Sequence, residues 1–440
     1  MKKLLSTTFC VFGSLLFAQE LNKPALDSLF TYMNREKIGA GSVSILRDGK
    51  EIYANSYGNR DYENSLQNNT QTKFRIGSIS KTFTATLIMK MVENGKLTLD
   101  TKLSQFYPNI INADKITIQN LLQHTSGIQN ITSTPSYLEW YLKDISKPEM
   151  LAKIDKLTSD FEPNTKEKYS NTNYILLTYI LEDISKTKYE NLLQKYIIKP
   201  LKLTNTKIGS KISNNNNEAK SYEYQNNNYI LQPETSMTVP LGAGFIVSTP
   251  TDLNTFMNAL LNAKILNPTT VSQMKTINET HGFGLFNDKI DNEIGIGHNG
   301  AIDAFRSYTF CFEATKFCYS VIQNSNEVNL AVIKNNLFNA TYNLKINYPK
   351  KVISVKIETK TLAKYTNTYT STDIPIGISF FVENNTLMAQ GDGQPPFALT
   401  ANNQTNFTFE PAKIEIIFSE DGKTMQMIQN KRTFNFIKKD

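Results

Sequence analysis

The sequence predicts an α/β protein, in which an antiparallel sheet is flanked by helices with a helical lobe and is followed by a small C-terminal antiparallel β-barrel. Residues 41–57 (GSVSILRDGKEIYANSY) read as two strands joined by an Asp-Gly turn, which is a strong hairpin signal. Apolar residues recur at helical spacing in 82–93 and through much of 116–262. From about residue 360, short alternating runs indicate several antiparallel strands.

The remaining elements complete this outline. Strands are expected near 296–323 and a helix at about 327–344, so the sheet takes strands from both ends of the main domain. In the C-terminal part, Asp421-Gly422 marks a further hairpin turn. The runs assigned to barrel strands are IPIGISFFVE, TLMAQ, NFTFE, KIEIIF, TMQMI and RTFNFI.

The N-terminus has the pattern of a secretory signal peptide. MKKLLSTTFCVFGSLLFAQE combines two lysines, a short apolar stretch and a small residue, Ala18, before polar sequence. We therefore expect a signal peptide over 1–18 and export to the periplasm or the cell exterior. The main domain is assigned to 19–346, a linker to 347–359 and the barrel to 360–440. After signal removal, no segment is apolar enough to span a membrane.

Charge and composition exclude several classes of partner. The chain of 440 residues carries a formal net charge of +7, which falls to +5 (7 − 2) without the two signal lysines. The lysines are scattered and form no basic stripe with aromatic residues, so nucleic acid is not expected as a partner. The three histidines lie far apart without ligand spacing, so neither a metal nor another cofactor is predicted. A small-molecule or peptide substrate remains, and the sequence leaves the oligomeric state open.

A serine and a lysine stand one helical turn apart in FRIGSISK (74–81). The apolar run after it predicts a helix that begins near Ser78 and is capped by Gly95. Positions i and i+3 share a helix face, which brings the Ser78 hydroxyl within reach of the Lys81 amine. Free N–H groups at a helix N-terminus also favour negative charge beside Ser78. Since Ser-x-x-Lys also occurs at 185–188 and 272–275, this spacing needs further support.

Two downstream segments supply that support. Tyr169-Ser170-Asn171 precedes a periodic helix, NYILLTYILEDIS. Gly297-His298-Asn299-Gly300 precedes AFRSYTFCF, which alternates like a strand. Ser-x-x-Lys, Tyr-x-Asn and His-x-Gly therefore follow one another in chain order.

With these three boxes in this order, the chain resembles the serine hydrolases of the penicillin-recognising fold. That family includes class C β-lactamases, D-alanyl-D-alanine peptidases, D-amino-acid peptidases and related esterases. The resemblance extends over nearly the whole mature chain through ITIQNLLQHTSGI (116–128), GAGFIVSTPTDLNTFMNALL (242–261) and HGFGLF (281–286). It implies a β-lactamase/transpeptidase-like fold. The segment from 360 resembles the lipocalin-like module of some exported members, and either a binding role or packing against the hydrolase is open for it.

The resemblance implies roles for the three boxes. Ser78 attacks a carbonyl and forms an acyl-enzyme, and either Lys81 or Tyr169 takes its proton, because the two titrate as a coupled pair. The backbone N–H groups of Ser78 and Ala301 are expected to form the oxyanion hole. The residues expected to bind substrate are Asn171, His298, Asn299 and Gly300.

Other polar residues receive weaker assignments. His298 stands where lysine is common in the family, which favours a peptidase or esterase over a dedicated β-lactamase. His124 and His281 are interpreted as structural. Arg306 is a minor candidate for binding a carboxylate, with a surface ion pair as the plainer interpretation. Asn164 replaces a common glycine, and Asn tolerates a left-handed turn.

Cys311 and Cys318 are the two cysteines left after signal removal. A four-residue hairpin loop at 313–316 would place them opposite each other on antiparallel strands. In an exported protein such a pair can form a disulfide, and two buried free thiols are the alternative.

The predicted function is an exported serine hydrolase that cleaves an amide or ester through an acyl-enzyme on Ser78, with peptides containing D-amino acids as one substrate class. A class C-like β-lactamase is the alternative among enzymes. Outside enzymes, the alternative is a penicillin-binding-type sensor that is acylated without turnover. The activating pair at Ser78 argues against the sensor, since a pure binder does not need it.

Overall fold

The computed structural model describes residues 20–225, 227–351, 355, 357–383, 385–392, 396–409, 412–430 and 432–439. The predicted signal peptide, 1–18, lies outside the described residues. Within the described ranges, no helix has the length and apolar character needed to cross a membrane.

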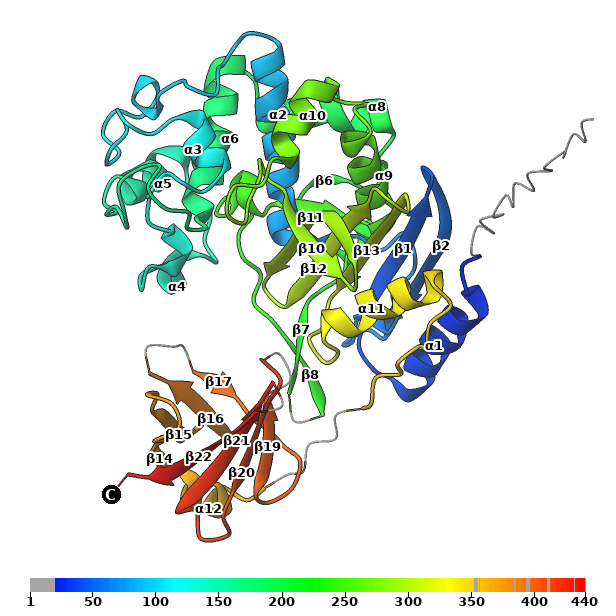
Figure 1. Cartoon of the computed structure of the whole chain (residues 1–440), viewed down its shortest axis with the longest axis vertical. Helices are drawn as coiled ribbons and strands as arrows, with labels where there is room; N and C mark the ends of the chain where they lie inside the picture. Colours follow the sequence, from blue (N-terminus) through cyan, green and yellow to red (C-terminus); the bar gives the residue numbers. More distant parts are fainter. Residues whose placement is uncertain are drawn as a thin grey trace, which may run out of the picture.

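A six-stranded sheet forms the centre of the hydrolase part (Figure 1). Its order is β10-β11-β12-β13-β1-β2, and all neighbouring strands are antiparallel. The strands are β1 (Gly41–Arg47), β2 (Lys50–Tyr57), β10 (Phe286–Ile290), β11 (Glu293–Ile302), β12 (Phe305–Phe312) and β13 (Phe317–Gln323). The N-terminal hairpin therefore completes a sheet made from much later sequence, as predicted.

Helices cover both faces of this sheet (Figure 1). On one face, α1 (Lys23–Glu36) and α11 (Leu330–Thr341) share a buried cluster with β1 and β13. On the other face, α2 (Ser80–Glu93) and α9 (Pro250–Leu261) belong to a second and larger buried cluster. Burial of apolar surface against both faces is what stabilises such a layered arrangement. Helix α11 is shorter at both ends than the sequence suggested.

The middle of the chain forms the helical lobe. Helix α6 (Asn171–Ser185) packs against α2, and ten of its consecutive residues are buried. The other helices of this region are short: α3 (Ile118–Leu122), α4 (Tyr137–Trp140), α5 (Lys147–Ile154), α7 (Tyr189–Leu193), α8 (Lys199–Leu201) and α10 (Pro268–Lys275). Small antiparallel pairs accompany them: β3 (Asn59–Asp61) with β4 (Leu66–Gln67), β5 (Phe74–Arg75) and β6 (Lys207–Ile208) with β9 (Ile246–Ser248), and β7 (Tyr222–Gln225) with β8 (Asn228–Leu231).

The C-terminal part is a nine-stranded, nearly closed antiparallel sheet that follows the short helix α12 (Thr359–Leu362) (Figure 1). Its strand order is β17-β16-β15-β14-β22-β21-β20-β19-β18, and a cluster of buried aromatic and aliphatic residues fills it. The strands are β14 (Asn367–Thr370), β15 (Ile378–Glu383), β16 (Thr386–Gly391), β17 (Phe397–Ala398), β18 (Thr400–Ala401), β19 (Asn406–Phe409), β20 (Ile414–Phe418), β21 (Thr424–Gln429) and β22 (Arg432–Lys438). The predicted α/β class with a C-terminal barrel is thus confirmed.

Candidate active site

Ser78 lies in a tight turn and not in the helix that follows. Residues Gly77–Ile79 form a 3₁₀ turn, and α2 begins at Ser80, two residues later than the sequence suggested. Gly77 has φ 52°, and a Cβ there would lie 2.8 Å from the backbone nitrogen of Ala301. Only glycine fits this left-handed turn pressed against a strand. The turn therefore holds Ser78 directly beside β11.

Lys81 is fully buried on the first turn of α2, and its amine has three oxygen neighbours. Its Nζ lies 3.0 Å from Ser78 Oγ, 2.8 Å from Asn171 Oδ1 and 2.9 Å from the Ala243 carbonyl oxygen. Burial lowers the pKa of the Lys81 amine well below its ordinary value. A neutral amine has two N–H groups and one lone pair. If Asn171 and Ala243 accept the two N–H groups, the lone pair is left for the Ser78 hydroxyl.

Tyr169 approaches the same oxygen from another side. Its hydroxyl donates to Ser78 Oγ at 2.8 Å. Burial raises the pKa of the Tyr169 phenol above its ordinary value. The two shifts have opposite meanings for proton transfer: burial favours a neutral Lys81, which can accept a proton, and a neutral Tyr169, which can donate one. Burial therefore favours Lys81 over Tyr169 as the group able to accept a proton from Ser78.

Asn171, the first residue of α6, is fixed by three hydrogen bonds. Its backbone N–H donates to Asn130 Oδ1 at 3.0 Å, and its Nδ2 donates to Thr132 Oγ1 at 2.9 Å. The side-chain oxygen is thereby turned toward Lys81. Asn171 thus orients the lysine amine.

Strand β11 passes directly over the serine turn. A Cβ on Gly300 would lie 2.1 Å from the Ile76 carbonyl oxygen and 3.0 Å from the Ser78 nitrogen. Among the turn and loop bonds of the described residues, the Ser78 N–H donates to no carbonyl. The Ser78 N–H and the neighbouring backbone of Ala301 lie where an oxyanion hole is expected.

His298 is buried beside this strand backbone. Its Nδ1 lies 2.5 Å from the Asn299 carbonyl oxygen, so Nδ1 carries the proton and Nε2 has a free lone pair. Burial, with a smaller contribution from Lys81, lowers the pKa of His298 to about 3. The imidazole is therefore neutral at physiological pH.

A family model described as Beta-lactamase matches residues 26–342, most of the chain. The chain belongs to the beta-lactamase family. This confirms the resemblance inferred from the three boxes. The match spans the sheet, the helical lobe and the serine turn, and it ends before the C-terminal barrel.

Curated relatives of this beta-lactamase family member include one protein of Bacillus subtilis and one of Staphylococcus aureus. The chain is 29% identical over 254 residues to PbpX of Bacillus subtilis (strain 168), named as a penicillin-binding protein, covering 56% of this chain and 62% of that one. It is 26% identical over 228 residues to the teichoic acid D-alanine hydrolase of Staphylococcus aureus (strain MRSA252), covering 52% and 56%. The chain thus spans about six tenths of the length of these relatives.

One solved structure is similar over almost the whole chain. The octameric penicillin-binding protein homologue from Pyrococcus abyssi is 22% identical and superposes with a TM-score of 0.63. The alignment covers 94% of this chain and 99% of that one. At this identity the similarity supports the fold alone, and it extends beyond the part that the family model matches.

In this family member, Ser78 lines a cleft of about 490 Å³. The described residues that line it are Ser78, Tyr169, His281, Phe286, His298, Asn299, Gly300, Ala301, Arg306, Ser307 and Leu330. Apart from Lys81, which is buried, and Asn171, which points to it, all the predicted catalytic and substrate-binding residues therefore meet in one cleft. Their catalytic and binding roles remain predictions.

One of the minor assignments changes, that of His281. His281 lines the cleft, and its Nδ1 lies 2.5 Å from Glu167 Oε1, so the structural interpretation missed its position. No sequence motif links Glu167 and His281, because the two residues lie in separate loops. His124 does have the structural role expected: its ring packs 4.5 Å from that of Tyr169, and its Nδ1 accepts the Ser170 N–H. Asn164 adopts φ 68°, as predicted for a left-handed turn.

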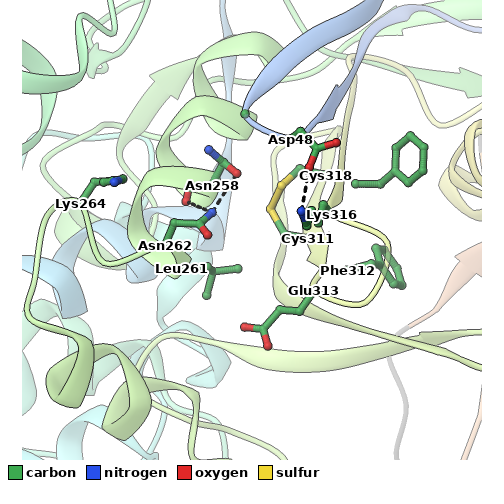
Figure 2. A pocket seen from close by; sticks show the side chains of 12 residues that line it. Asp48, Asn258, Leu261, Asn262, Lys264, Cys311, Phe312, Glu313, Lys316 and Cys318 are labelled. Carbon is green, nitrogen blue, oxygen red and sulfur yellow. Dashed lines mark hydrogen bonds and ion pairs between the residues drawn. A yellow bond between two sulfur atoms is a disulfide. The ribbon is translucent and has the colours of Figure 1, made fainter. Parts of the chain in front are cut away.

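A second cavity, of about 610 Å³, lies away from Ser78 (Figure 2). Cys311 and Cys318 border it, and they pair directly across β12 and β13. The structure joins them in a disulfide, which decides between the two alternatives left open by the sequence. Asn258 of α9 and Asn262, which follows the end of that helix, line the opposite wall (Figure 2). Although larger, this cavity has no hydroxyl or free thiol among its described lining residues, in contrast to the cleft at Ser78.

Proposed function

We propose that this protein is an exported serine hydrolase that cleaves an amide or ester bond through an acyl-enzyme on Ser78. One observation carries the proposal: the Ser78 oxygen lies 3.0 Å from the buried Lys81 amine and 2.8 Å from the Tyr169 phenol. Such a pair of neighbours activates a hydroxyl and serves no purpose in a passive binding pocket. The names of the relatives, a penicillin-binding protein and a D-alanine hydrolase, support a substrate with a D-amino acid.

Acylation follows from the geometry. Ser78 Oγ attacks the substrate carbonyl carbon while its proton passes to the lone pair of Lys81 Nζ. The carbonyl oxygen becomes an oxyanion, which accepts the N–H groups of Ser78 and Ala301. Each such donor contributes about 3 to 4 kcal/mol to transition-state stabilisation. The proton then reaches the leaving nitrogen or oxygen from Lys81, with Tyr169 as the neighbouring donor.

Deacylation reverses the proton path. A water molecule attacks the acyl carbon of the ester on Ser78, and its proton passes through the same Lys81 and Tyr169 pair. The Ser78 oxygen then leaves as a hydroxyl. Both half-reactions balance without a cofactor, since the amine returns to its starting protonation state after each one.

Export is supported by two independent observations. The first 18 residues have the composition of a signal peptide. The Cys311–Cys318 disulfide is a bond that forms and persists mainly in oxidising compartments. Secretion of the full-length chain into the periplasm or medium of a host, followed by N-terminal sequencing, tests this part; cytoplasmic retention of an uncleaved chain would contradict it.

A substrate panel tests the hydrolase proposal. It contains a short-chain nitrophenyl ester, D-alanyl peptides and nitrocefin, and each is assayed with wild type and Ser78→Ala. We expect turnover of an ester or D-alanyl substrate that Ser78→Ala abolishes. Preferred turnover of nitrocefin would favour a β-lactamase. Stoichiometric labelling by a serine-reactive probe without turnover of any substrate would favour the sensor and defeat the proposal.

A further inference from the structure

His281 and Glu167 form a pair beside the Ser78 cleft that the proposed mechanism does not use. They lie in the loops before β10 and α6, and His281 Nδ1 lies 2.5 Å from Glu167 Oε1. The Glu167 side chain is 3% exposed and that of His281 is 18% exposed. Among the described residues of the cleft lining, His281 is present and Glu167 is absent. The imidazole is therefore the part of the pair that a molecule in the cleft meets.

The carboxylate fixes the tautomer of the imidazole. Burial raises the pKa of the Glu167 carboxyl, but hydrogen bonds from His281 and Thr280 outweigh it, and the pKa lies below its ordinary value. An ionised carboxylate only accepts hydrogen bonds, so Nδ1 of His281 carries the proton. In the neutral imidazole the lone pair is then on Nε2. The hydrogen bonds that His281 makes with other described side chains all use Nδ1, which leaves Nε2 available to a molecule in the cleft.

Three aromatic rings hold the His281 imidazole in this position. Its centroid lies 5.1 Å from that of His124, 5.6 Å from that of Phe286 and 5.6 Å from that of Tyr169. The backbone is also fixed, because His281 forms an antiparallel bridge with Phe286 at the start of β10. Tyr169 in turn donates to Ser78 Oγ at 2.8 Å. His281 is therefore a direct neighbour of the ring whose hydroxyl contacts the nucleophile, and all three line the same cleft.

Deacylation requires a water molecule held in the right orientation, and the Lys81 and Tyr169 pair takes only one of its two hydrogens. The Lys81 amine is fully buried and has three oxygen neighbours, so it offers no second site. His298 also has a free Nε2, but the whole residue is 1% exposed. At 18% side-chain exposure, His281 is the more accessible acceptor for the second hydrogen.

We propose that His281 Nε2 accepts a hydrogen bond from the water that hydrolyses the acyl-enzyme, and that Glu167 is the positioning residue that keeps Nε2 free for it. This inference rests on the proposed function at Ser78. In this step the water oxygen bonds to the acyl carbon, and one of its protons passes to the Lys81 and Tyr169 pair. Its other hydrogen stays on the oxygen and is held by Nε2 during the attack. The bond between the acyl carbon and Ser78 Oγ then breaks, and Oγ takes the proton back from the pair.

Steady-state kinetics with nitrophenyl acetate separate deacylation from acylation. In an acyl-enzyme mechanism kcat/KM reports acylation alone, whereas kcat also contains deacylation. His281→Phe keeps an aromatic ring in the cleft wall and removes Nε2. We expect kcat to fall about 10²-fold, as for a misplaced reactant, while kcat/KM stays within about threefold of wild type. Mass spectrometry of acid-quenched protein should show more acetyl group on Ser78 in this variant than in wild type.

Further variants separate a water-holding role from a structural one. His281→Gln keeps an oxygen that accepts a hydrogen bond, so it should restore part of the lost kcat. Glu167→Ala removes the acceptor of Nδ1, and kcat should fall about tenfold because the imidazole is no longer held in one tautomer. Glu162→Ala is the matched control, since Glu162 lies in the same loop, is exposed and pairs with Lys115. Its kcat should equal that of wild type.

A joint fall of kcat and kcat/KM in His281→Phe, or an unchanged kcat without added acetyl-enzyme, would overturn the inference. If His281→Phe does not fold, Glu167→Ala and Glu162→Ala decide, and equal kcat values in these two variants would count against it. Absence of an acetyl group on Ser78 in every variant, with no effect of Ser78→Ala on turnover, would instead show that the proposed hydrolase function is wrong.

Discussion

Replacing Lys81 by methionine tests the proton acceptor of the proposed mechanism. The substitution keeps the length of the side chain and removes the group that can take the Ser78 proton. General base catalysis contributes about 10²- to 10⁴-fold, so we expect kcat/KM for a nitrophenyl ester to fall by about 10³-fold. Ser78 Oγ, Asn171 Oδ1 and the Ala243 carbonyl would all lose the amine that lies within 3.0 Å of them.

The same substitution has a signature in stability against pH. The Lys81 pKa is lowered by burial, so between that pKa and the ordinary value of about 10.4 the unfolded wild type binds one proton more than the folded form. Its free energy of unfolding therefore rises with pH, by about 1.4 kcal/mol per pH unit. In Lys81→Met this contribution is absent. The stability of the variant relative to wild type should thus decrease by about 1.4 kcal/mol for each pH unit that separates the lowered Lys81 pKa from about 10.4.

Urea unfolding of both proteins across this pH range measures the difference. Lys90→Met is the matched control, because Lys90 lies on the same helix, partly exposed, and pairs with Glu93. Lys90→Met should keep wild-type activity. The difference in unfolding free energy between Lys90→Met and wild type should not decrease with pH in this way. If the Lys81→Met difference does not change with pH, the lysine is charged in the folded protein and the assignment of the base is refuted.

Three further substitutions test other parts of the site. Tyr169→Phe removes a phenol that donates to Ser78, and kcat/KM should fall about 10²-fold at unchanged stability; a variant as active as wild type would exclude Tyr169 from proton transfer. Gly300→Ala places a Cβ 2.1 Å from the Ile76 carbonyl oxygen, so β11 must move and ester hydrolysis should fall about 100-fold; a change below threefold would contradict the close approach. Replacing Cys311 and Cys318 by serine should lower the unfolding free energy by about 2 to 3 kcal/mol and leave ester hydrolysis within about twofold, because the bridge lies outside the Ser78 cleft.

Much of the fold could be predicted from local sequence. The hairpin β1–β2 was evident because Asp48 and Gly49 adopt the positive φ angles that a tight turn requires. The predicted start of α2, near Ser78, is two residues too early. Its apolar pattern continues without a break into a 3₁₀ turn, whose tighter geometry is imposed by the strand above Gly77.

The site was predictable where residues lie in ordered boxes, and less so where the tertiary structure decides. Ser78, Tyr169 and His298 were found through their motifs. The partnership of His281 with Glu167 was missed, since it joins two loops with no common motif. The Lys81 protonation state also depends on surroundings, because only the folded chain shows that the amine is fully buried between two carbonyl acceptors.

The pairing of Gly41 with Gln323 in the central sheet has a consequence for biosynthesis. Ser78 and Lys81 are translated early. Strand β11, which contains Ala301, and strand β13, which joins β12 to β1, are among the last parts of the hydrolase to be translated. Pairings so distant in sequence form slowly and late. The nascent polypeptide thus presents an ordinary, unreactive serine to its surroundings until nearly all of the hydrolase part has been synthesised.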